Sequence, residues 1–316
     1  THTGDTLCNS KNPILLSEIK YPTSNMSFAV QPKTRGDEEK IANGLAVMHE
    51  EDPTFMYRVD PELKQTIMSG QGDQHIDITL NRIKNRFNIE FVRSTPKIPY
   101  RETITMNSDA KYRHKKQSGG SGQFAEVWLK IAPTERGSGI DFSNSLVGQN
   151  VDRGFVPSVE KGINALCGDG IIAGCSVVDV KIDFYDGKMH PVDSNDMAFQ
   201  IAGRHAFSDA IKTAQPKLLE PIYKIQVKVP DDFTGDIMGD ISSRRGRVQG
   251  MDSEGHYQVI NAELPLACLH DYSTALKAMS SGRGMFNQEF SHYEDMPPNE
   301  AQKVISTWEA ARAAGE

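Results

Sequence analysis

The sequence predicts a multidomain α+β protein in which two copies of a βαββαβ unit flank a different α/β domain. Strand and helix patterns follow one another in that order near the N-terminus, and the same order recurs near the C-terminus. The segment between the two copies has longer alternating strands and its own helices. The 316 residues are enough for three domains of about 100 residues each.

The first unit is predicted from alternation and helical spacing. Met26, Phe28 and Val30 alternate as a half-buried strand, and Asp37-Glu38-Glu39 is typical of a helix start. The later elements are expected at residues 41–48 (helix), 55–59 (strand), 65–69 (strand), 76–87 (helix) and 89–91 (strand). This order is the ferredoxin-like plan.

The second unit repeats the plan between residues 222 and 297. Ile225, Val227 and Val229 alternate with polar residues as its first strand. The elements after it are expected at residues 231–244 (helix), 247–251 (strand), 256–263 (strand), 264–279 (helix) and 285–290 (strand). A last helix, at about 298–314, begins at a proline and has one apolar side.

The middle segment, residues 98–221, follows a different pattern. Strands are expected at residues 125–131 and 178–184, and helices at residues 157–166 and 194–213. We expect Asp193 or Ser194 to cap the second of these helices, with Asp196 in its first turn.

A basic stretch at residues 111–123 stands out within this middle segment. Its first six residues hold four lysines or arginines together with His114, and residues 118–122 are only serine and glycine. Because this composition cannot form a core, we expect the whole stretch to be a solvated loop. Local positive charge on a chain of net charge -7 favours a polyanionic partner, although a merely solvated hairpin tip is the simpler alternative.

Composition excludes several classes of protein. Apolar residues make up 38% and charged residues 24% of the chain, which is ordinary for a globular protein, and no apolar run approaches the roughly 20 residues of a membrane span. The four cysteines form no C-x-x-C, so we expect free thiols. The histidines show no metal-binding spacing, and no G-x-x-x-x-G-K-[ST] phosphate loop occurs.

Several motifs carry a resemblance to a known family. Lys116-Gln-Ser-Gly-Gly-Ser-Gly-Gln123 resembles the characteristic loop of bacterial translation elongation factor G. Residues 51–55, 190–194 and 235–246 match further family motifs in family order, so the resemblance covers essentially the whole chain. It implies that residues 11–97 are domain III, 98–221 are domain IV with a fold like domain 2 of ribosomal protein S5, and 222–297 are domain V.

The resemblance also implies what surrounds this chain. Residues 1–10 would be the remnant of a preceding β-barrel domain, and the helix at 298–316 would pack near domain IV. The family's GTPase domain has no counterpart here, so we expect GTP and Mg²⁺ to belong to a missing part of a longer parent. We expect no catalytic site and no cofactor within this fragment, and a cytoplasmic monomer that binds the ribosome and no membrane.

In the family, the tip of domain IV reaches the decoding site and domain V rests on ribosomal RNA. The residues expected to contact tRNA and mRNA are His114, Lys115, Lys116, Gln117, Ser118, Gly119, Gly120, Ser121, Gly122, Gln123, His190 and Asp193. The residues expected to contact rRNA are Arg244, Arg245, Arg247 and Arg283. The second group has an alternative interpretation, in which arginines complement a helix dipole.

The sequence departs from the family pattern at a few positions. Pro191 replaces an acidic residue, and Gln71 and Gln74 replace apolar ones. His190 could be oriented by Asp193 for proton transfer, but an exposed histidine can also stack on a base or donate a hydrogen bond without such chemistry. The loop at 150–157 is expected to join the tip.

The resemblance implies a role in GTP-dependent translocation of tRNA and mRNA. The alternatives are a tetracycline-type ribosomal-protection factor or a ribosome-recycling paralogue. Protection factors generally lack the Gln-Ser-Gly-Gly-x-Gly-Gln tip, which favours translocation. A phosphate-binding enzyme and a generic RNA-binding module are the more distant alternatives.

Overall fold

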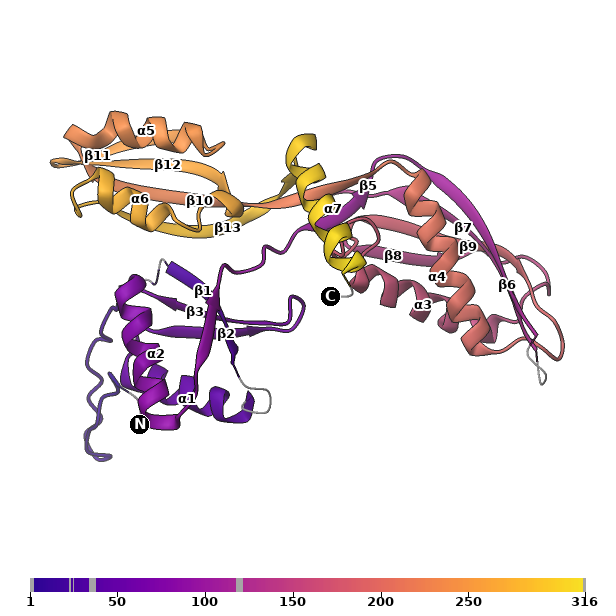
Figure 1. The fold of residues 1–316 in the computed structure, drawn as a ribbon, viewed down its shortest axis with the longest axis horizontal. Coiled ribbons are helices and arrows are strands. Elements are labelled where there is room, and N and C mark those ends of the chain that lie inside the picture. Colours follow the sequence, from indigo (N-terminus) through magenta and orange to yellow (C-terminus); the bar gives the residue numbers. More distant parts are fainter. Residues whose placement is uncertain (1–2, 23, 25, 34–37, 118–121, 315–316) are drawn as a thin grey trace. The chain divides into compact units, whose positions relative to one another are not determined.

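The structure is a computed structural model that describes residues 3–22, 24, 26–33, 38–117 and 122–314. The chain forms two compact units, residues 1–98 with 221–292 and residues 99–220 with 293–316. Helices alternate with strands along the chain, and the strands form three sheets (Figure 1). This confirms the predicted multidomain α+β class. Within the described ranges, no helix has both the length and the apolar content needed to cross a membrane.

The first sheet confirms the βαββαβ order near the N-terminus. Its elements are β1 (Met26–Pro32), α1 (Glu38–Glu51), β2 (Met56–Asp60), β3 (Gln65–Gly70), α2 (Asp73–Phe87) and β4 (Phe91–Ser94). The strands lie in the antiparallel order β2-β3-β1-β4, which is the ferredoxin-like arrangement. Leu45, Phe55, Met68 and Ile83 are buried in its core.

The second sheet repeats this arrangement in the order β11-β12-β10-β13. Its elements are β10 (Pro216–Pro230), α5 (Thr234–Ser243), β11 (Arg247–Glu254), β12 (Tyr257–Pro265), α6 (Tyr272–Met279) and β13 (Met285–Asp295). The helix predicted at 264–279 is too long. Leu264 and Pro265 still pair with β10, and α6 begins only at Tyr272 because a short 3₁₀ turn at Leu266–Cys268 intervenes.

The third sheet has the order β6-β7-β9-β8, with β8 parallel to β9. The elements of the middle domain are β5 (Arg101–Ile104), β6 (Ser108–Lys116), β7 (Gln123–Pro133), β8 (Ile140–Asn144), α3 (Val156–Asp169), β9 (Val180–Lys188) and α4 (Asp196–Thr213). Helices α3 and α4 lie together on one face of this sheet (Figure 1), where Val127, Leu129, Phe184, Phe199 and Phe207 are fully buried. Among the helices that the structure describes, none covers the opposite face.

The expectation that residues 111–123 form a loop is wrong for residues 111–116. These residues belong to β6, and they pair with β7 from Lys111↔Trp128 to Lys116↔Gln123. Alternation explains how so basic a segment forms a strand. Tyr112 faces the helices and stacks on His205 of α4 at 4.6 Å, while the charged neighbours are exposed. Ser118 to Ser121, which are predicted to contact tRNA and mRNA, lie outside the residues that the structure describes.

A buried carboxylate organises the base of the middle domain. Glu102 of β5 is fully buried, and its two oxygens accept hydrogen bonds from four backbone amides. The donors are Ile171 (2.8 Å), Ile172 (3.0 Å), Ala173 (2.9 Å) and Cys175 (3.1 Å). One side chain therefore fixes the conformation of the loop that follows α3.

The last helix, α7 (Pro298–Ala313), packs on that loop. Gly174 has a φ of +67°, and a Cβ at this position would lie 2.2 Å from Nε1 of Trp308. Glycine is therefore required here both for its backbone conformation and for the close approach of the indole ring.

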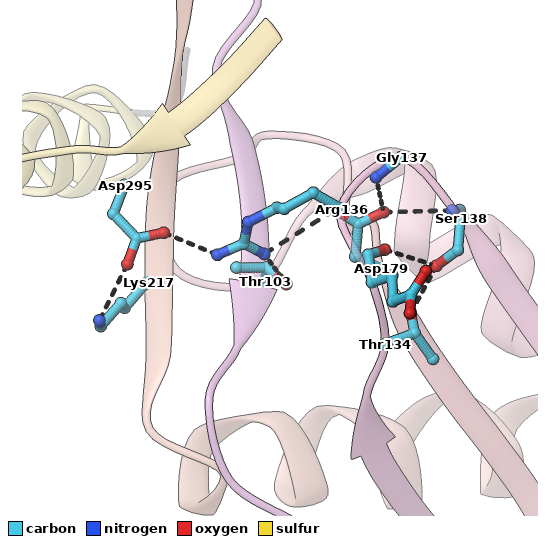
Figure 2. A network of polar contacts seen from close by, with 10 residues as sticks. Thr103, Thr134, Arg136, Gly137, Ser138, Asp179, Lys217 and Asp295 are labelled. Atoms are coloured by element: carbon cyan, nitrogen blue, oxygen red, sulfur yellow. Dashed lines mark hydrogen bonds and ion pairs between the residues drawn. The ribbon is translucent and has the colours of Figure 1, made fainter.

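An arginine between two carboxylates ties the end of β13 to the same domain (Figure 2). Arg136 donates from Nη2 to Asp295 at 2.6 Å, and its Nη1 lies 3.8 Å from the buried Asp179. Its Nη1 also donates to Thr103 at 3.3 Å, and Lys217 donates to Asp295 at 3.0 Å. The acidic end of β13 is thus held by two cations from different elements.

Candidate nucleic-acid interface

Three loops of the middle domain meet beyond the ends of its strands. The backbone amide of Phe124, just after the glycine-rich connection, donates to the carbonyl of Asp193 at 2.9 Å. The amide of Met189 donates to the carbonyl of Asn150 at 3.2 Å. The structure therefore brings the start of β7 together with residues 189–195, and residues 189–195 together with residues 150–157.

Asp193 and Ser194 join the first two loops. The carboxylate of Asp193 accepts a hydrogen bond from the Gly122 amide at 3.2 Å. The hydroxyl of Ser194 donates to the carbonyl of Phe124 at 2.7 Å and accepts from the amide of His190 at 2.8 Å. These contacts fix the position of the His190 loop relative to the start of β7.

The expected cap of α4 is wrong. Asn195 is the N-cap, and its Oδ1 accepts a hydrogen bond from the Ala198 amide at 2.8 Å. Asp193 and Ser194 cannot serve this purpose because their side chains are engaged with the neighbouring loop. Asp196, in the first turn as expected, accepts from the Ser158 hydroxyl at 2.7 Å and so also joins α4 to α3.

The His190 side chain is 50% exposed and lies beside Phe124, with ring centroids 6.3 Å apart. Its Nδ1 accepts hydrogen bonds from the backbone amides of Val192 (3.3 Å) and Asp193 (3.2 Å). The same Nδ1 lies 3.4 Å from Oδ2 of Asp193. In the neutral tautomer in which Nδ1 accepts the two amide bonds, Nε2 carries the proton. In that tautomer His190 offers an N–H donor to a partner.

The remaining tip residues divide between the two faces of the β6–β7 hairpin. Half-buried His114 contacts Gln123, with 3.0 Å between Nε2 and Oε1. Lys115, Lys116 and Gln117 are exposed. Phe124 was not predicted as part of this site, because a single phenylalanine in a strand carries no distinguishing signal. Ser194 was predicted only as a possible helix cap and as part of the motif at residues 190–194.

Arg244 differs from the other arginines of its cluster. Its side chain is only 17% exposed, and its guanidinium donates to Asp240 (2.8 Å), Asp271 (2.7 Å) and the carbonyl of Cys268 (2.9 Å). The hydrogen bond from Arg244 is the main reason that the pKa of Asp271 is lowered. The guanidinium also lies 5.4 Å from the ring centroid of Tyr272, so this residue holds α5 and α6 together.

The other three arginines of the cluster are exposed. Arg245 ends the turn after α5 with a φ of +64°, and Arg247 begins β11. Arg283 lies over the ring of Phe233 at 4.9 Å. Only three of the four arginines predicted to contact rRNA are therefore exposed, because Arg244 faces the protein interior.

In the first unit, Gln71 and His75 form a local network. The Gln71 amide donates to Nδ1 of His75 at 3.1 Å, and Nε2 of His75 lies 2.9 Å from Asp52. Although burial raises the pKa of Asp52, hydrogen bonds from Thr54 and His75 outweigh it, so the pKa is lowered overall. The side chain of Gln71 donates to the carbonyl of Pro22 at 3.0 Å, which gives this departure from the family pattern a structural role.

Family models for three consecutive domains match the chain. They are described as elongation factor G domain III (residues 21–95), elongation factor G domain IV (residues 96–215) and elongation factor G C-terminus (residues 217–304). Together these ranges cover the three sheets described above.

Individual relatives agree with these matches. The elongation factors G of Ruegeria sp. (strain TM1040), Ruegeria pomeroyi and Dinoroseobacter shibae are each 46% identical over 304 residues, covering 96% of this chain and 43% of theirs. A crystal structure from Thermus thermophilus superposes with a TM-score of 0.80 at 36% identity, covering 92% of this chain and 44% of that one. The chain thus spans less than half the length of these relatives. It belongs to the elongation factor G family and comprises domain III, domain IV and the C-terminal domain of that family.

Proposed function

We propose that this chain is the ribosome-binding part of a translational GTPase that promotes GTP-dependent translocation of tRNA and mRNA. The observation that carries the proposal is the joining of the His190 loop to the glycine-rich connection through Asp193 and Ser194. These contacts hold the His190 loop against the start of β7, and family membership supplies the ribosome as the partner.

The side chains of the tip are suited to bind a nucleic-acid duplex whatever its base sequence. Exposed Lys115 and Lys116 can pair with phosphates, and such contacts position a protein on nucleic acid rather than specify bases. His190 offers a donor for a backbone or base oxygen of the tRNA–mRNA pair. In the same proposal, Arg245, Arg247 and Arg283 contact rRNA, while Arg244 holds their scaffold.

GTP and Mg²⁺ are proposed to bind outside this chain, in a parent that has the length of the curated relatives. The contribution of this chain is then mechanical: its tip occupies space that tRNA leaves, and contacts made there favour the forward state of the ribosome. We further propose that the parent is a cytoplasmic monomer.

Ribosome binding by the purified chain tests the proposal. Sedimentation should show binding that weakens steeply as salt rises, because each lysine–phosphate contact releases counterions. His190→Ala with Lys116→Ala should weaken it, whereas Lys161→Gln, on an exposed turn of α3, should not. Salt-insensitive binding, or none by a folded chain, would contradict the proposal.

A codon-stepping assay on the intact parent distinguishes translocation from protection or recycling. The His190→Ala change should slow stepping by at least tenfold if translocation is the function. A variant that instead steps normally but loses the release of a ribosome-bound antibiotic or the splitting of ribosomal subunits would contradict this. The function would then be ribosomal protection or ribosome recycling, respectively, and not translocation.

A further inference from the structure

The sheet of the middle domain has an open face that the tip does not account for. Alternation along β7 places Val127 and Leu129 against the helices, fully buried, and turns Trp128 the other way, where it is partly exposed. The same alternation turns Lys111 of β6 to this open face, directly across from Trp128.

Hydrogen bonds among neighbouring side chains hold the Trp128 ring in place. Its Nε1 donates to Glu126 at 2.9 Å, and the other oxygen of that carboxylate accepts from Nε of Arg113 at 2.6 Å. The Glu126 side chain is only 7% exposed. A buried carboxylate therefore anchors the indole edge and is itself neutralised by an arginine, so the ring is oriented before any ligand arrives.

A β-bulge adds a second ring to this face. Trp128 pairs with Asp186 and Leu129 pairs with Phe184, so Tyr185 is the extra residue on β9. The bulge turns Tyr185 toward the open face, where its ring centroid lies 6.1 Å from that of Trp128 in an edge-to-face arrangement. Two aromatic side chains on neighbouring strands thus form one platform.

Each ring has a lysine over it. Nζ of Lys111 lies 5.5 Å from the Trp128 centroid, and Nζ of Lys130 lies 4.5 Å from the Tyr185 centroid. Lys188 extends the positive charge along β9. Beside Lys130, a hollow of about 420 Å³ is lined by apolar and charged side chains of three strands, in which Lys130 and Lys181 stand beside Asp109 and Asp183.

We propose that this open face is a second nucleic-acid-binding surface, which takes an unpaired stretch of RNA by stacking bases on Trp128 and Tyr185. Bases would replace the two ammonium groups over the rings, and Lys111 and Lys130 would move to the flanking phosphates. Stacking on aromatic side chains within a cationic groove is how proteins bind single strands with little sequence preference.

Charge and composition favour RNA over a protein partner. Among the described outward positions of β6, β7 and β9, aromatic and charged residues are present and no leucine, isoleucine, valine or methionine is found. Protein interfaces usually centre on a larger apolar patch. The residues proposed to hold RNA here, Trp128, Tyr185, Lys111 and Lys130, are none of the predicted tip residues, so the inference does not depend on the proposed translocation role.

The two tryptophans of the chain, Trp128 and Trp308, allow a direct test by NMR. A ten-nucleotide RNA without self-complementarity is titrated into the isotope-labelled chain at low salt. We expect the indole N–H resonance of Trp128 to shift, and that of Trp308, which packs against Gly174, to stay in place. The same RNA annealed to its complement should shift Trp128 far less, because its bases are already stacked.

Variants make the test quantitative. Lys111→Gln with Lys130→Gln should weaken single-strand binding about tenfold or more and make the salt dependence shallower by about 1.4 in log–log slope, for two phosphates lost. Lys161→Gln with Lys303→Gln, on exposed helix positions, and His190→Ala should leave the Trp128 shift unchanged. Trp128→Phe should retain part of the affinity and Trp128→Leu little, in chains whose core amide exchange is normal.

Several results would overturn the inference. They are an unchanged Trp128 resonance at saturating RNA, equal shifts with duplex RNA, loss of the shift in His190→Ala, or an equal shift caused by a ten-residue polyglutamate peptide. The last result would identify a surface for acidic peptides instead.

Discussion

The carboxylate of Asp193 lies so close to the backbone of Gly122 that a Cβ on residue 122 would be 2.9 Å from its Cγ. The Gly122 amide donates to the same carboxylate at 3.2 Å, across 71 residues of sequence. A side chain at residue 122 would therefore displace the Asp193 carboxylate, so this contact depends on a glycine at that position.

Gly122→Ala should break this contact without unfolding the protein. The added methyl group forces the Asp193 side chain away, so the amide of residue 122 should exchange with solvent at least tenfold faster in hydrogen-exchange measurements, as expected when a hydrogen bond to a charged group is lost. Asp193→Ala should give the same result. The melting temperature should change by no more than about 2 °C, because neither residue belongs to the hydrophobic core of the domain.

Gly235→Ala is the matched control, because no atom lies within 4 Å of a Cβ at that helical position. It should leave exchange at residue 122 unaffected and stabilise α5 by up to about 1 kcal/mol. Unchanged exchange in both Gly122→Ala and Asp193→Ala would show that the two loops are held together by other contacts.

Glu102→Gln should strongly destabilise the middle domain. A carboxylate can accept all four amide hydrogen bonds, whereas an amide side chain has one acceptor oxygen and turns an NH₂ group toward backbone donors. We expect a loss of about 2–4 kcal/mol in the free energy of unfolding, measured in urea.

Exposed Glu135 provides the comparison for that charge change. Glu135→Gln should alter stability by less than about 0.5 kcal/mol. A Glu102→Gln protein as stable as Glu135→Gln would mean that the loop after α3 keeps its conformation without the carboxylate.

Arg244→Met and Arg283→Met should separate a structural arginine from an exposed one. Arg244→Met leaves Asp240 and Asp271 without their cation and should cost about 1–3 kcal/mol, seen as faster exchange of β12 amides. Arg283→Met should change stability little, although it should weaken ribosome binding in the proposed function. Because Arg244 lowers the pKa of Asp271, the Arg244 contribution should be present above about pH 4 and be lost as pH falls below it.

Sequence patterns were sufficient to predict an element where its buried residues recur at the regular spacing of a strand or a helix. Phe28 and Val30 mark β1 by alternation, and Ile76, Leu80 and Ile83 mark α2 by helical spacing. The repeated order of elements then gave the ferredoxin-like plan, because the order of strands and helices strongly limits how a sheet can be assembled.

Sequence patterns did not predict the structure where polar side chains make contacts with residues distant in the sequence. Lys111 and Lys115 obscured the β6 strand because its inward residues, such as Tyr112 and His114, are themselves polar or aromatic. Nothing local indicates that Glu102 is buried, or that Arg244 turns inward, since both depend on groups distant in sequence. Asn195 rather than Asp193 caps α4 because a contact with the β7 loop competes for Asp193.

The thiol of Cys167 should make stability depend on alkaline pH. Burial, and secondarily the negative charge of Glu102, raise its pKa to about 12. An unfolded cysteine titrates near pH 8.5, so between about pH 8.5 and 12 the folded state keeps a proton that the unfolded state releases. The free energy of unfolding should therefore fall with rising pH in this window, by up to about 1.4 kcal/mol per pH unit from this group alone.

Cys167→Ala isolates that effect, and Cys8→Ala, at an exposed position, is its control. At pH 7 the Cys167→Ala protein should be less stable than the wild type because a buried sulfur is lost. From pH 8 to pH 10 the difference between the two proteins should narrow, since only the wild type has this thiol to ionise on unfolding. Cys8→Ala should follow the wild-type curve throughout. A gap between wild type and Cys167→Ala that stays constant over this range would mean that the thiol has the same affinity for protons in the folded and unfolded states.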